Sequence, residues 1–171
     1  EDPNLASIMP GNLTGLTTNN EQKILQTYGM IAVELEGSSG EKLNLASGKP
    51  ATITLPIPTS LQAGAPATIP LWYFNDSLGI WKEEGAATKQ GNAYAGTVSH
   101  FSFWNCDVPA NFVNLKMILK NQNQELLPGY RVLLINKQTN SHAYGHTDSS
   151  GAVNGPVPIN TPIEMVVYNK C

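Results

Sequence analysis

The sequence predicts an all-β fold, arranged as two consecutive β-sandwich domains over residues 1–108 and 112–171. Short segments in both halves alternate apolar and polar residues with a period of two, which is typical of half-buried strands. The 15 glycines and 12 prolines mark turns between many of these segments. Helical periodicity extends no further than one short turn expected at residues 21–26, so helices contribute little to the predicted fold.

The first domain is expected to consist of short strands joined by turns rich in Gly, Asn and Pro. Its opening hairpin turns at Gly37-Ser38-Ser39-Gly40. Pro56 and Pro58 place the strand that contains them at a sheet edge, because proline cannot donate a ladder hydrogen bond. The strands predicted here cover residues 28–36, 42–45, 51–58, 70–75, 79–83 and 93–104, with a loop over residues 59–69.

Residues 97–107 form the stretch around which the first domain is organised. They contain two of the four Phe, one of the three Trp, one of the three His and one of the two Cys. As a central strand, this stretch places His100 and Ser102 on one face and Phe101 on the other. A neutral imidazole next to a hydroxyl can serve as its general base. We therefore expect His100 and Ser102 to lie close together, with Phe101 and Phe103 in the core against Trp72 or Trp81.

The stretch also carries a resemblance to the ZU-type (zona occludens/netrin receptor-like) domains. The matching segments are His100-Phe101-Ser102, Leu71-Trp72-Tyr73-Phe74-Asn75 and Gly79-Ile80-Trp81-Lys82-Glu83-Glu84-Gly85. The resemblance covers about residues 10–108 and extends to the similar module of cartilage intermediate layer proteins and bacterial envelope proteins. It implies a β-sandwich in an exported protein.

Certain ZU-type domains break their own chain between the Phe and the Ser of this tripeptide. The resemblance therefore implies that His100, Phe101 and Ser102 are candidates for autoproteolysis of the Phe101–Ser102 bond by an N-to-O acyl shift. Such a reaction also needs a twisted peptide bond and a donor for the oxyanion. Many relatives of the fold keep this strand uncleaved, so an intact structural strand is the alternative, and the sequence leaves both open.

The second domain is predicted from a new series of strands that begins at Val113, after Pro109 ends strand pairing in the first domain. Pro128-Gly129 and the turn from Thr147 to Gly151 separate its strands in an order that resembles the carboxypeptidase regulatory-like module, a transthyretin-type β-sandwich. About 60 residues is near the lower limit for an independent core. We therefore expect this domain to be small, to be truncated, and to depend on the first domain for burial.

Composition excludes several classes of function. Charged residues make up 13% of the 171 residues, the net charge is −3, and Arg131 is the sole arginine. Nucleic-acid binding relies on clusters of Arg and Lys, so no nucleic-acid partner is expected. No apolar stretch is long enough for a spanning helix. The chain begins without Met or a signal peptide, so we expect a mature or trimmed piece.

The two cysteines allow two interpretations. A disulfide between Cys106 and Cys171 would close a loop of about 65 residues and contribute roughly 4 kcal/mol. The alternative is one buried thiol and one terminal thiol. Two cysteines are too few to decide the redox compartment.

Other candidate residues have ordinary explanations. His142 and His146 are four apart near Asp148, but in a loop or strand this spacing does not bring two ligands together, so surface histidines are expected. Glu83 and Glu84 are adjacent and are expected to be solvated turn residues on opposite sides. Motifs for phosphate-binding loops, Cys-x-x-Cys sites and serine-hydrolase elbows are missing, so the sequence predicts no metal, no cofactor and no classical active site.

The expected function is a non-enzymatic structural or binding module of a secreted or cell-envelope protein, of which a lipoprotein is one form. The alternative is an autoproteolytic domain that acts once on its own chain. A third hypothesis, a carbohydrate-binding module, depends on exposed Trp and Tyr side chains. A protein or a glycan is the expected kind of partner, and the sequence predicts no oligomeric state.

Overall fold

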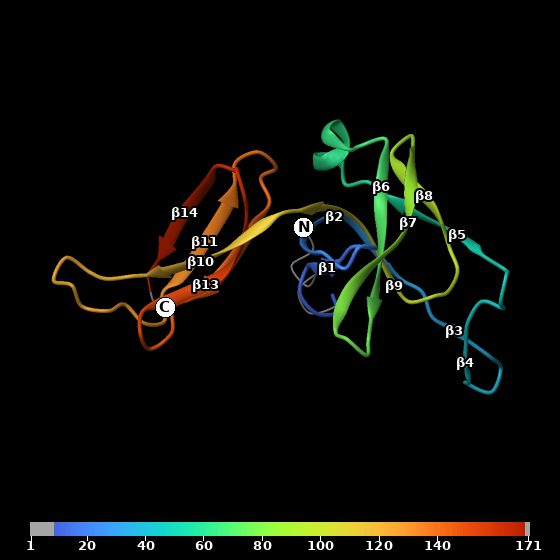
Figure 1. Cartoon of the computed structure of the whole chain (residues 1–171), viewed down its shortest axis with the longest axis horizontal. Coiled ribbons are helices and arrows are strands. Elements are labelled where there is room, and N and C mark those ends of the chain that lie inside the picture. Colours follow the sequence, from blue (N-terminus) through green and yellow to red (C-terminus); the bar gives the residue numbers. More distant parts are fainter. Residues whose placement is uncertain (1–8, 170–171) are drawn as a thin grey trace. The chain divides into compact units, whose positions relative to one another are not determined.

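The computed structural model describes residues 9–169 and is built almost entirely of strands, as Figure 1 shows. The chain divides into two compact units, Glu1–Ala110 and Asn111–Cys171, called unit 1 and unit 2 below. The predicted all-β class is confirmed. The identity of the units with the two named domain types stays a prediction.

Unit 1 contains nine strands and one short 3-10 helix among its described residues. They are β1 (Thr14–Leu16), β2 (Gln22–Ala32), β3 (Leu35–Glu36), β4 (Lys42–Leu43), β5 (Ala51–Pro56), the 3-10 helix η1 (Thr59–Gly64), β6 (Thr68–Asn75), β7 (Ile80–Gln90), β8 (Ala93–Val98) and β9 (Phe103–Ala110).

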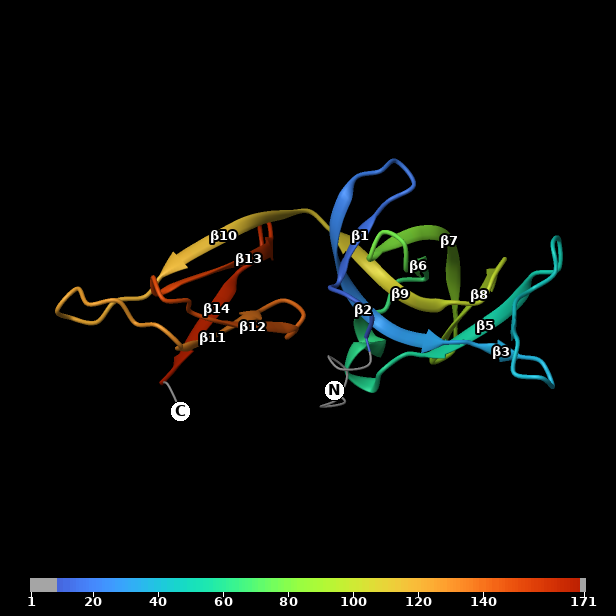
Figure 2. The same ribbon diagram turned by 90° about the horizontal axis from the view of Figure 1, so that it is seen from below.

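Seven of these strands form one strongly curved sheet in the order β1-β2-β9-β6-β7-β8-β5. Neighbouring strands are antiparallel, but β1 also pairs with β7 in a parallel arrangement through Gly15 opposite Trp81. This second pairing joins β1, β2, β9, β6 and β7 into a closed ring. Figure 2 labels these five strands in unit 1. A ring of this kind removes free edges from five of the strands.

Two bulges produce the curvature. One lies in β2 between Thr27 and Met30 opposite β9, where Gly29 has φ of +150°. The other lies where β7 faces β6, and there Gly85 has φ of +76°. A bulge inserts an extra residue into one strand and sharpens its bend, and glycine accepts the left-handed backbone without a steric cost.

The curved sheet encloses two hydrophobic clusters. The smaller contains Leu25, Trp72 and Trp81. The larger has Trp104 and Cys106 among its members, together with Tyr28, Ile53, Leu55, Ile57, Ile69, Leu71, Ala87, Tyr94 and Val98. All three tryptophans are 0% exposed. Trp72 and Trp81 are therefore core residues, as large aromatics usually are.

Several local predictions in unit 1 were wrong. Residues 22–26 belong to β2 and are not helical, because the tertiary pairing with β1 and β9 overrides their weak helical pattern. Residues 59–64 of the expected loop form η1. Pro109 does not end strand pairing, since it lies opposite Leu25 in the β2–β9 pair. The edge position expected from Pro56 is confirmed, because β5 pairs with β8 alone in the sheet.

Unit 2 contains five strands in two small sheets. The strands are β10 (Phe112–Ile118), β11 (Arg131–Asn136), β12 (His142–His146), β13 (Ala152–Pro158) and β14 (Ile163–Tyr168). One sheet is β10-β13 and the other is β12-β11-β14. The predicted turn after Thr147 is present: Asp148 Oδ1 accepts hydrogen bonds from the backbone N–H of Ser150 at 2.8 Å and of Ala152 at 3.0 Å.

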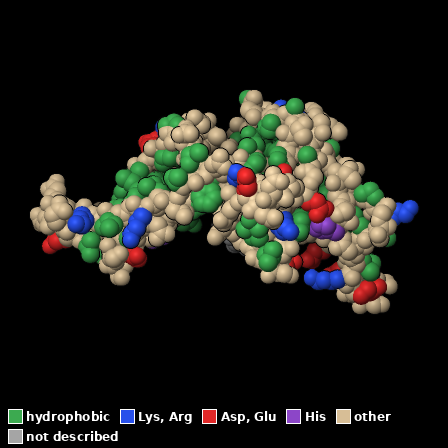
Figure 3. Space-filling view, viewed as in Figure 1, with side chains coloured by type: hydrophobic (Ala, Val, Ile, Leu, Met, Phe, Trp, Pro, Cys, Tyr) green, Lys and Arg blue, Asp and Glu red, His purple; other side chains and the backbone are tan. Residues whose placement is uncertain are grey.

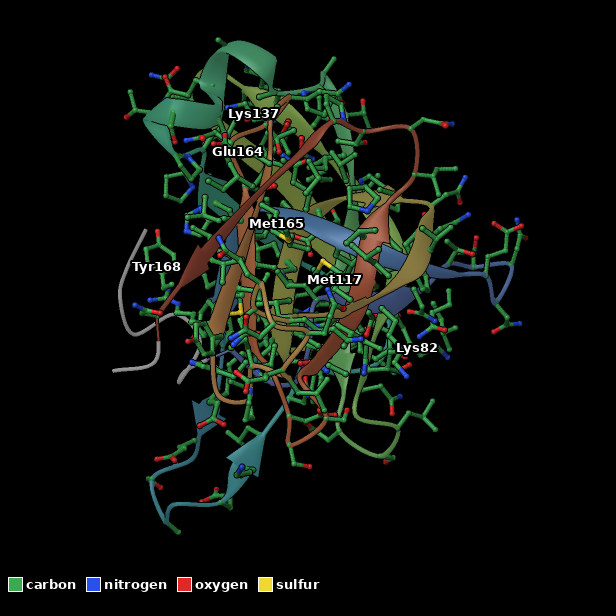
Figure 4. All side chains as sticks on the ribbon, turned by 90° about the vertical axis from the view of Figure 1, so that its left-hand side faces the viewer. Lys82, Met117, Lys137, Glu164, Met165 and Tyr168 are labelled. Atoms are coloured by element: carbon green, nitrogen blue, oxygen red, sulfur yellow. The ribbon has the colours of Figure 1, made fainter. Side chains whose placement is uncertain are left out.

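The two sheets of unit 2 approach each other closely where β12 faces β13. A Cβ placed on Gly145 of β12 would lie 2.8 Å from Val153 Cγ2 of β13, so a larger residue there would require Val153 to shift. On the other side, β10 and β14 are the edge strands of their sheets. Val113 is 54% exposed and Met165 is 51% exposed. Figure 4 labels Met165 on β14 and Met117 on β10. Of the described hydrophobic residues in unit 2, Val132 and Ala152 are the ones fully buried.

Candidate functional site

The His100-Phe101-Ser102 tripeptide lies outside the strands. Strand β8 ends at Val98 and β9 begins at Phe103, so residues 99–102 form the bend that joins them. The expected continuous strand from Val98 to Trp104 is therefore wrong, although β9 is central in the sheet between β2 and β6. The aromatic and polar residues that failed to alternate reflect this bend.

His100 is held by contacts on three sides. Its Nε2 lies 3.6 Å from Glu84 Oε2, and Glu84 Oε1 also accepts a hydrogen bond from the Ser99 hydroxyl at 2.8 Å. The imidazole contacts the Tyr73 ring edge-to-face at 4.8 Å and the Trp104 ring at 5.0 Å. The His100 carbonyl accepts a hydrogen bond from Trp104 Nε1 at 3.1 Å. The imidazole is thus directed towards a carboxylate at the surface.

Ser102 makes its hydrogen bonds elsewhere. Its hydroxyl donates to the Phe74 carbonyl at 3.2 Å, and its own carbonyl accepts from Val33 N–H at 3.2 Å. In the described part of the chain no hydrogen bond joins the Ser102 hydroxyl to His100. The expectation that these two side chains form a base–nucleophile pair is therefore not met by the geometry.

Phe101 is fixed by a residue that the sequence did not single out. Asn44 Oδ1 accepts a hydrogen bond from Phe101 N–H at 2.7 Å, and Asn44 Nδ2 donates to the Phe101 carbonyl at 3.1 Å. The amide side chain thus pairs with both polar groups of one peptide segment, 57 positions away. No spacing rule connects residues so distant, so only the fold reveals this contact.

The Phe101 side chain is half-buried against the larger cluster, whose members do not include Trp72 or Trp81. Phe103, two residues later, packs against the smaller cluster with Trp72 and Trp81. The expected burial against these tryptophans therefore applies to Phe103 and not to Phe101. None of residues 99–102 has a positive φ, so this bend carries no left-handed backbone strain.

A groove adjoins the Phe101–Ser102 bond. Its volume is about 370 Å³, and its walls come from the β2–β3 connection, the β3–β4 hairpin, Asp76 and residues 101–103. Lys42 Nζ lies 3.8 Å from Glu34 Oε1 within this lining. Figure 3 shows histidine beside acidic side chains on unit 1. Three acidic residues, Glu34, Glu36 and Asp76, contribute to these walls.

Two buried polar side chains, Asn105 and Asp107, occur on the face of β9 opposite to Trp104 and Cys106. Asp107 and Asn105 are both 0% exposed, and neither oxygen of the Asp107 carboxyl has a hydrogen-bond partner among the described residues. Burial raises the pKa of Asp107 to about 8. The Thr27 hydroxyl lowers the pKa of Asp107 and so opposes the effect of burial. Because this hydroxyl donates its hydrogen bond to Asn105 Oδ1 at 3.3 Å, it offsets the effect of burial only in part. No pattern in the sequence indicates this buried group.

The remaining candidates show no reactive arrangement. Burial, with the neighbouring Asp107 charge, raises the pKa of the Cys106 thiol to about 12, so it is not a nucleophile at neutral pH. Cys171 lies outside the described residues, and its pairing with Cys106 stays a prediction. His142 and His146 lie on β12, where strand geometry separates them by roughly 13 Å. No group of three His, Cys, Asp or Glu residues suited to a metal occurs in residues 9–169.

Glu83 and Glu84 lie in β7 rather than in a turn. Glu83 Oε2 accepts a hydrogen bond from Thr18 N–H at 3.1 Å, whereas Glu84 contacts Ser99 and His100. The two carboxylates therefore serve different neighbours and do not form a catalytic pair. Within residues 9–169, no helix has the length and apolar character needed to cross a membrane.

Comparison with known proteins gives one distant relative. The chain is 26% identical to human cartilage intermediate layer protein 2 over 176 aligned positions, which cover 88% of this chain and 15% of that protein. The chain thus spans only a small part of the length of this relative. No protein-family model matches the sequence. No solved structure matches it either.

Proposed function

We propose that this chain is a non-enzymatic structural or binding module of a secreted or cell-envelope protein, and that it works with its backbone unbroken. The observation that carries the proposal is the separation of His100 from Ser102: the imidazole pairs with Glu84, and the hydroxyl donates to the Phe74 carbonyl. A serine without a base has little nucleophilic character at neutral pH. The distant relative, named for the cartilage intermediate layer, supports an extracellular setting.

Autoproteolysis is the second candidate, and one contact favours it. Asn44 Nδ2 already donates to the Phe101 carbonyl at 3.1 Å, the position at which an oxyanion donor is needed. Cleavage would then require His100 to leave Glu84 and reach the Ser102 hydroxyl. No residue of the bend between β8 and β9 has a left-handed backbone, so strain of that kind does not assist the rearrangement.

Intact-mass spectrometry of the purified chain after prolonged incubation at neutral pH distinguishes the two candidates. We expect a single species of 18.4 kDa, identical in behaviour to the Ser102→Ala variant. Two associated fragments that separate under denaturing conditions, with a new N-terminus at Ser102, would establish cleavage. In that case Ser102→Ala should abolish the fragments, and His100→Ala should slow their formation.

A further inference from the structure

The outer face of the β12-β11-β14 sheet carries an unusual group of side chains. In the strand register, Arg131 of β11 lies between His146 of β12 and Tyr168 of β14. One step along, Leu133 lies between Tyr144 and Val166. Alternation places these residues on the face opposite Val132, the buried residue of β11. We call this surface, defined by Arg131, Tyr144 and Tyr168, the Arg–Tyr face.

The guanidinium of Arg131 is held between two tyrosine rings. Its Cζ lies 4.6 Å from the centre of the Tyr144 ring and 5.6 Å from the centre of the Tyr168 ring. Tyr144 is 59% exposed and Tyr168 is 46% exposed, so both rings also present surface to solvent. Figure 4 shows Tyr168 at the end of β14. Cation–π contact orients the guanidinium and leaves the N–H donors at its edge available.

No acidic side chain among residues 9–169 neutralises the charge of Arg131. No ion pair to Arg131 occurs among the described residues, and Glu164, the acidic residue on the same face, is paired with Lys137 at 2.6 Å. Residues 111–171 contain five Lys or Arg and three Asp or Glu, whereas residues 1–110 contain five and ten. The chain's sole arginine therefore stands exposed on the positively charged unit, where it complements an anion.

The shape of the Arg–Tyr face favours one class of anionic partner over others. Two exposed rings flank one guanidinium, and the half-buried Leu133 and Val166 lie in the same sheet face. A partner that presents flat, partly apolar rings with one carboxylate on each would match both features. An acidic peptide supplies carboxylates on flexible side chains but little rigid ring surface to cover the tyrosines.

We propose that the Arg–Tyr face binds an acidic polysaccharide, with a uronate carboxylate bonded to Arg131 and sugar rings packed on Tyr144 and Tyr168. The inference rests on the proposed function and deepens it, because it gives the module a class of partner. The bond to the carboxylate is bidentate, which a lysine at this position could not form.

Binding of the full chain to polygalacturonate, measured by isothermal titration calorimetry, tests the proposal, with dextran as the uncharged polysaccharide and polyglutamate as the acidic peptide. We expect binding to polygalacturonate, none to dextran and weaker binding to polyglutamate. Arg131→Ala should lower the affinity by about tenfold or more, since a hydrogen bond to a charged group is lost. Arg131→Lys should lose most of the same affinity, and Tyr144→Ala should also weaken binding.

Lys116→Ala is the matched control, because it removes one positive charge from unit 2 on the other sheet, at β10. Its affinity should stay within about twofold of the original chain, and thermal melts should show that every variant remains folded. Absence of polygalacturonate binding, equal losses in Lys116→Ala and Arg131→Ala, or equal affinity for polyglutamate would each overturn the proposal. If any of these results is found in an uncleaved chain, the polysaccharide proposal is wrong and the proposed function is unaffected. Cleavage at Ser102 would contradict the proposed function, whatever ligand the chain binds.

Discussion

Unit 1 and unit 2 are both built of antiparallel strands, yet they bury their side chains differently. In unit 1 the sheet closes through β1, and all three tryptophans are 0% exposed. In unit 2 the two sheets approach closely at Gly145 and Val153, while Val113 and Met165 remain about half exposed on the other side. Closure of a sheet, rather than strand content, decides how much apolar surface is removed from water.

The difference in burial indicates different roles for the two units. Burial of large aromatics is the main source of folding free energy, so unit 1 should carry most of the stability of the chain. Unit 2 keeps apolar and aromatic side chains at its surface, where they are available for contact with other molecules. Figure 3 shows hydrophobic side chains gathered on the surface of unit 2.

The largest expected effect comes from truncating a buried tryptophan in unit 1. Trp72 is fully buried and its Nε1 donates to the Asp107 carbonyl at 3.0 Å. Trp72→Ala should reduce the free energy of unfolding by about 3–5 kcal/mol in urea denaturation. Met165→Ala in unit 2 should cost about 1 kcal/mol or less, because half of that side chain is already exposed. Equal losses would remove the contrast between the units.

Two carboxyl groups, one in each unit, should make the stability of the chain depend on pH with opposite signs. The pKa of Asp107 is raised to about 8 in the folded chain, so its protonated form is favoured by folding. Its contribution is fully present below the unfolded value near 3.8 and is lost as the pH rises towards 8, by at most about 1.4 kcal/mol per pH unit. Asp107→Asn should therefore flatten the decline in melting temperature between pH 4 and pH 8.

Asp148 in unit 2 provides the opposite case. Hydrogen bonds from Ser150 and Ala152 lower the pKa of its carboxyl. Its stabilising effect is therefore present above the unfolded value and is lost as the pH falls through the folded value. Asp148→Asn should lower the melting temperature at neutral pH and have little effect in strong acid.

For Asp107, the contradicting outcome is a pH profile of Asp107→Asn parallel to that of the original chain, which would show that Asp107 is ionised in the folded state.

A matched pair of glycines tests the packing difference with one methyl group. A Cβ on Gly96 in β8 would lie 2.7 Å from Leu71 Cδ1 and 3.0 Å from Ala87 Cβ, whereas a Cβ on Gly155 in β13 meets nothing within 4 Å. Gly96→Ala should destabilise the chain by about 1–3 kcal/mol through overpacking. Gly155→Ala should leave the unfolding midpoint nearly unchanged. Tolerance of both substitutions would show that the surroundings of Gly96 in unit 1 are packed as loosely as those of Gly155 in unit 2.

The smallest effect concerns Asn44 and Asn121, two asparagines whose side chains bond to backbone groups. Asn44 joins segments 57 positions apart, while Asn121 Oδ1 bonds to N–H groups of Asn123 and Glu125 within its own loop. Asn44→Ala should cost about 1 kcal/mol and speed hydrogen exchange at the Phe101 amide. Asn121→Ala should leave exchange at Phe101 unchanged. Similar exchange at Phe101 in both variants would show that Asn44 does not hold the bend.

The sequence predicted the strands well where alternation and turn residues agreed. The β6–β7 hairpin, the edge position of β5 and the turn at Asp148 all follow from local chemistry that proline, glycine and Asx residues determine. The prediction at residues 99–102 is wrong because aromatic residues on both faces of a segment are also compatible with a bend. Contacts such as Trp104 Nε1 to the His100 carbonyl show that these aromatics cover a bend.

The candidate site was predicted less well, for a physical reason. His100 and Ser102 are two residues apart, and this spacing brings side chains together only if the backbone is extended. The partners that determine their roles, Glu84, Asn44 and the Phe74 carbonyl, come from three distant segments of the chain. Closure of the ring through β1 was equally invisible, because three residues of a short strand carry no periodic signal.

Hydrogen exchange of the intact chain, followed by mass spectrometry, tests the contrast between the units most directly. We predict that amides of β6, β7 and β9 in unit 1 exchange only on global unfolding, because their strands lie within the closed ring. Amides of β10 and β14 in unit 2 should exchange earlier, through local opening of edge strands. Protection of β10 and β14 equal to or greater than that of β9 would contradict the account, since unit 2 would then be as firmly closed as unit 1.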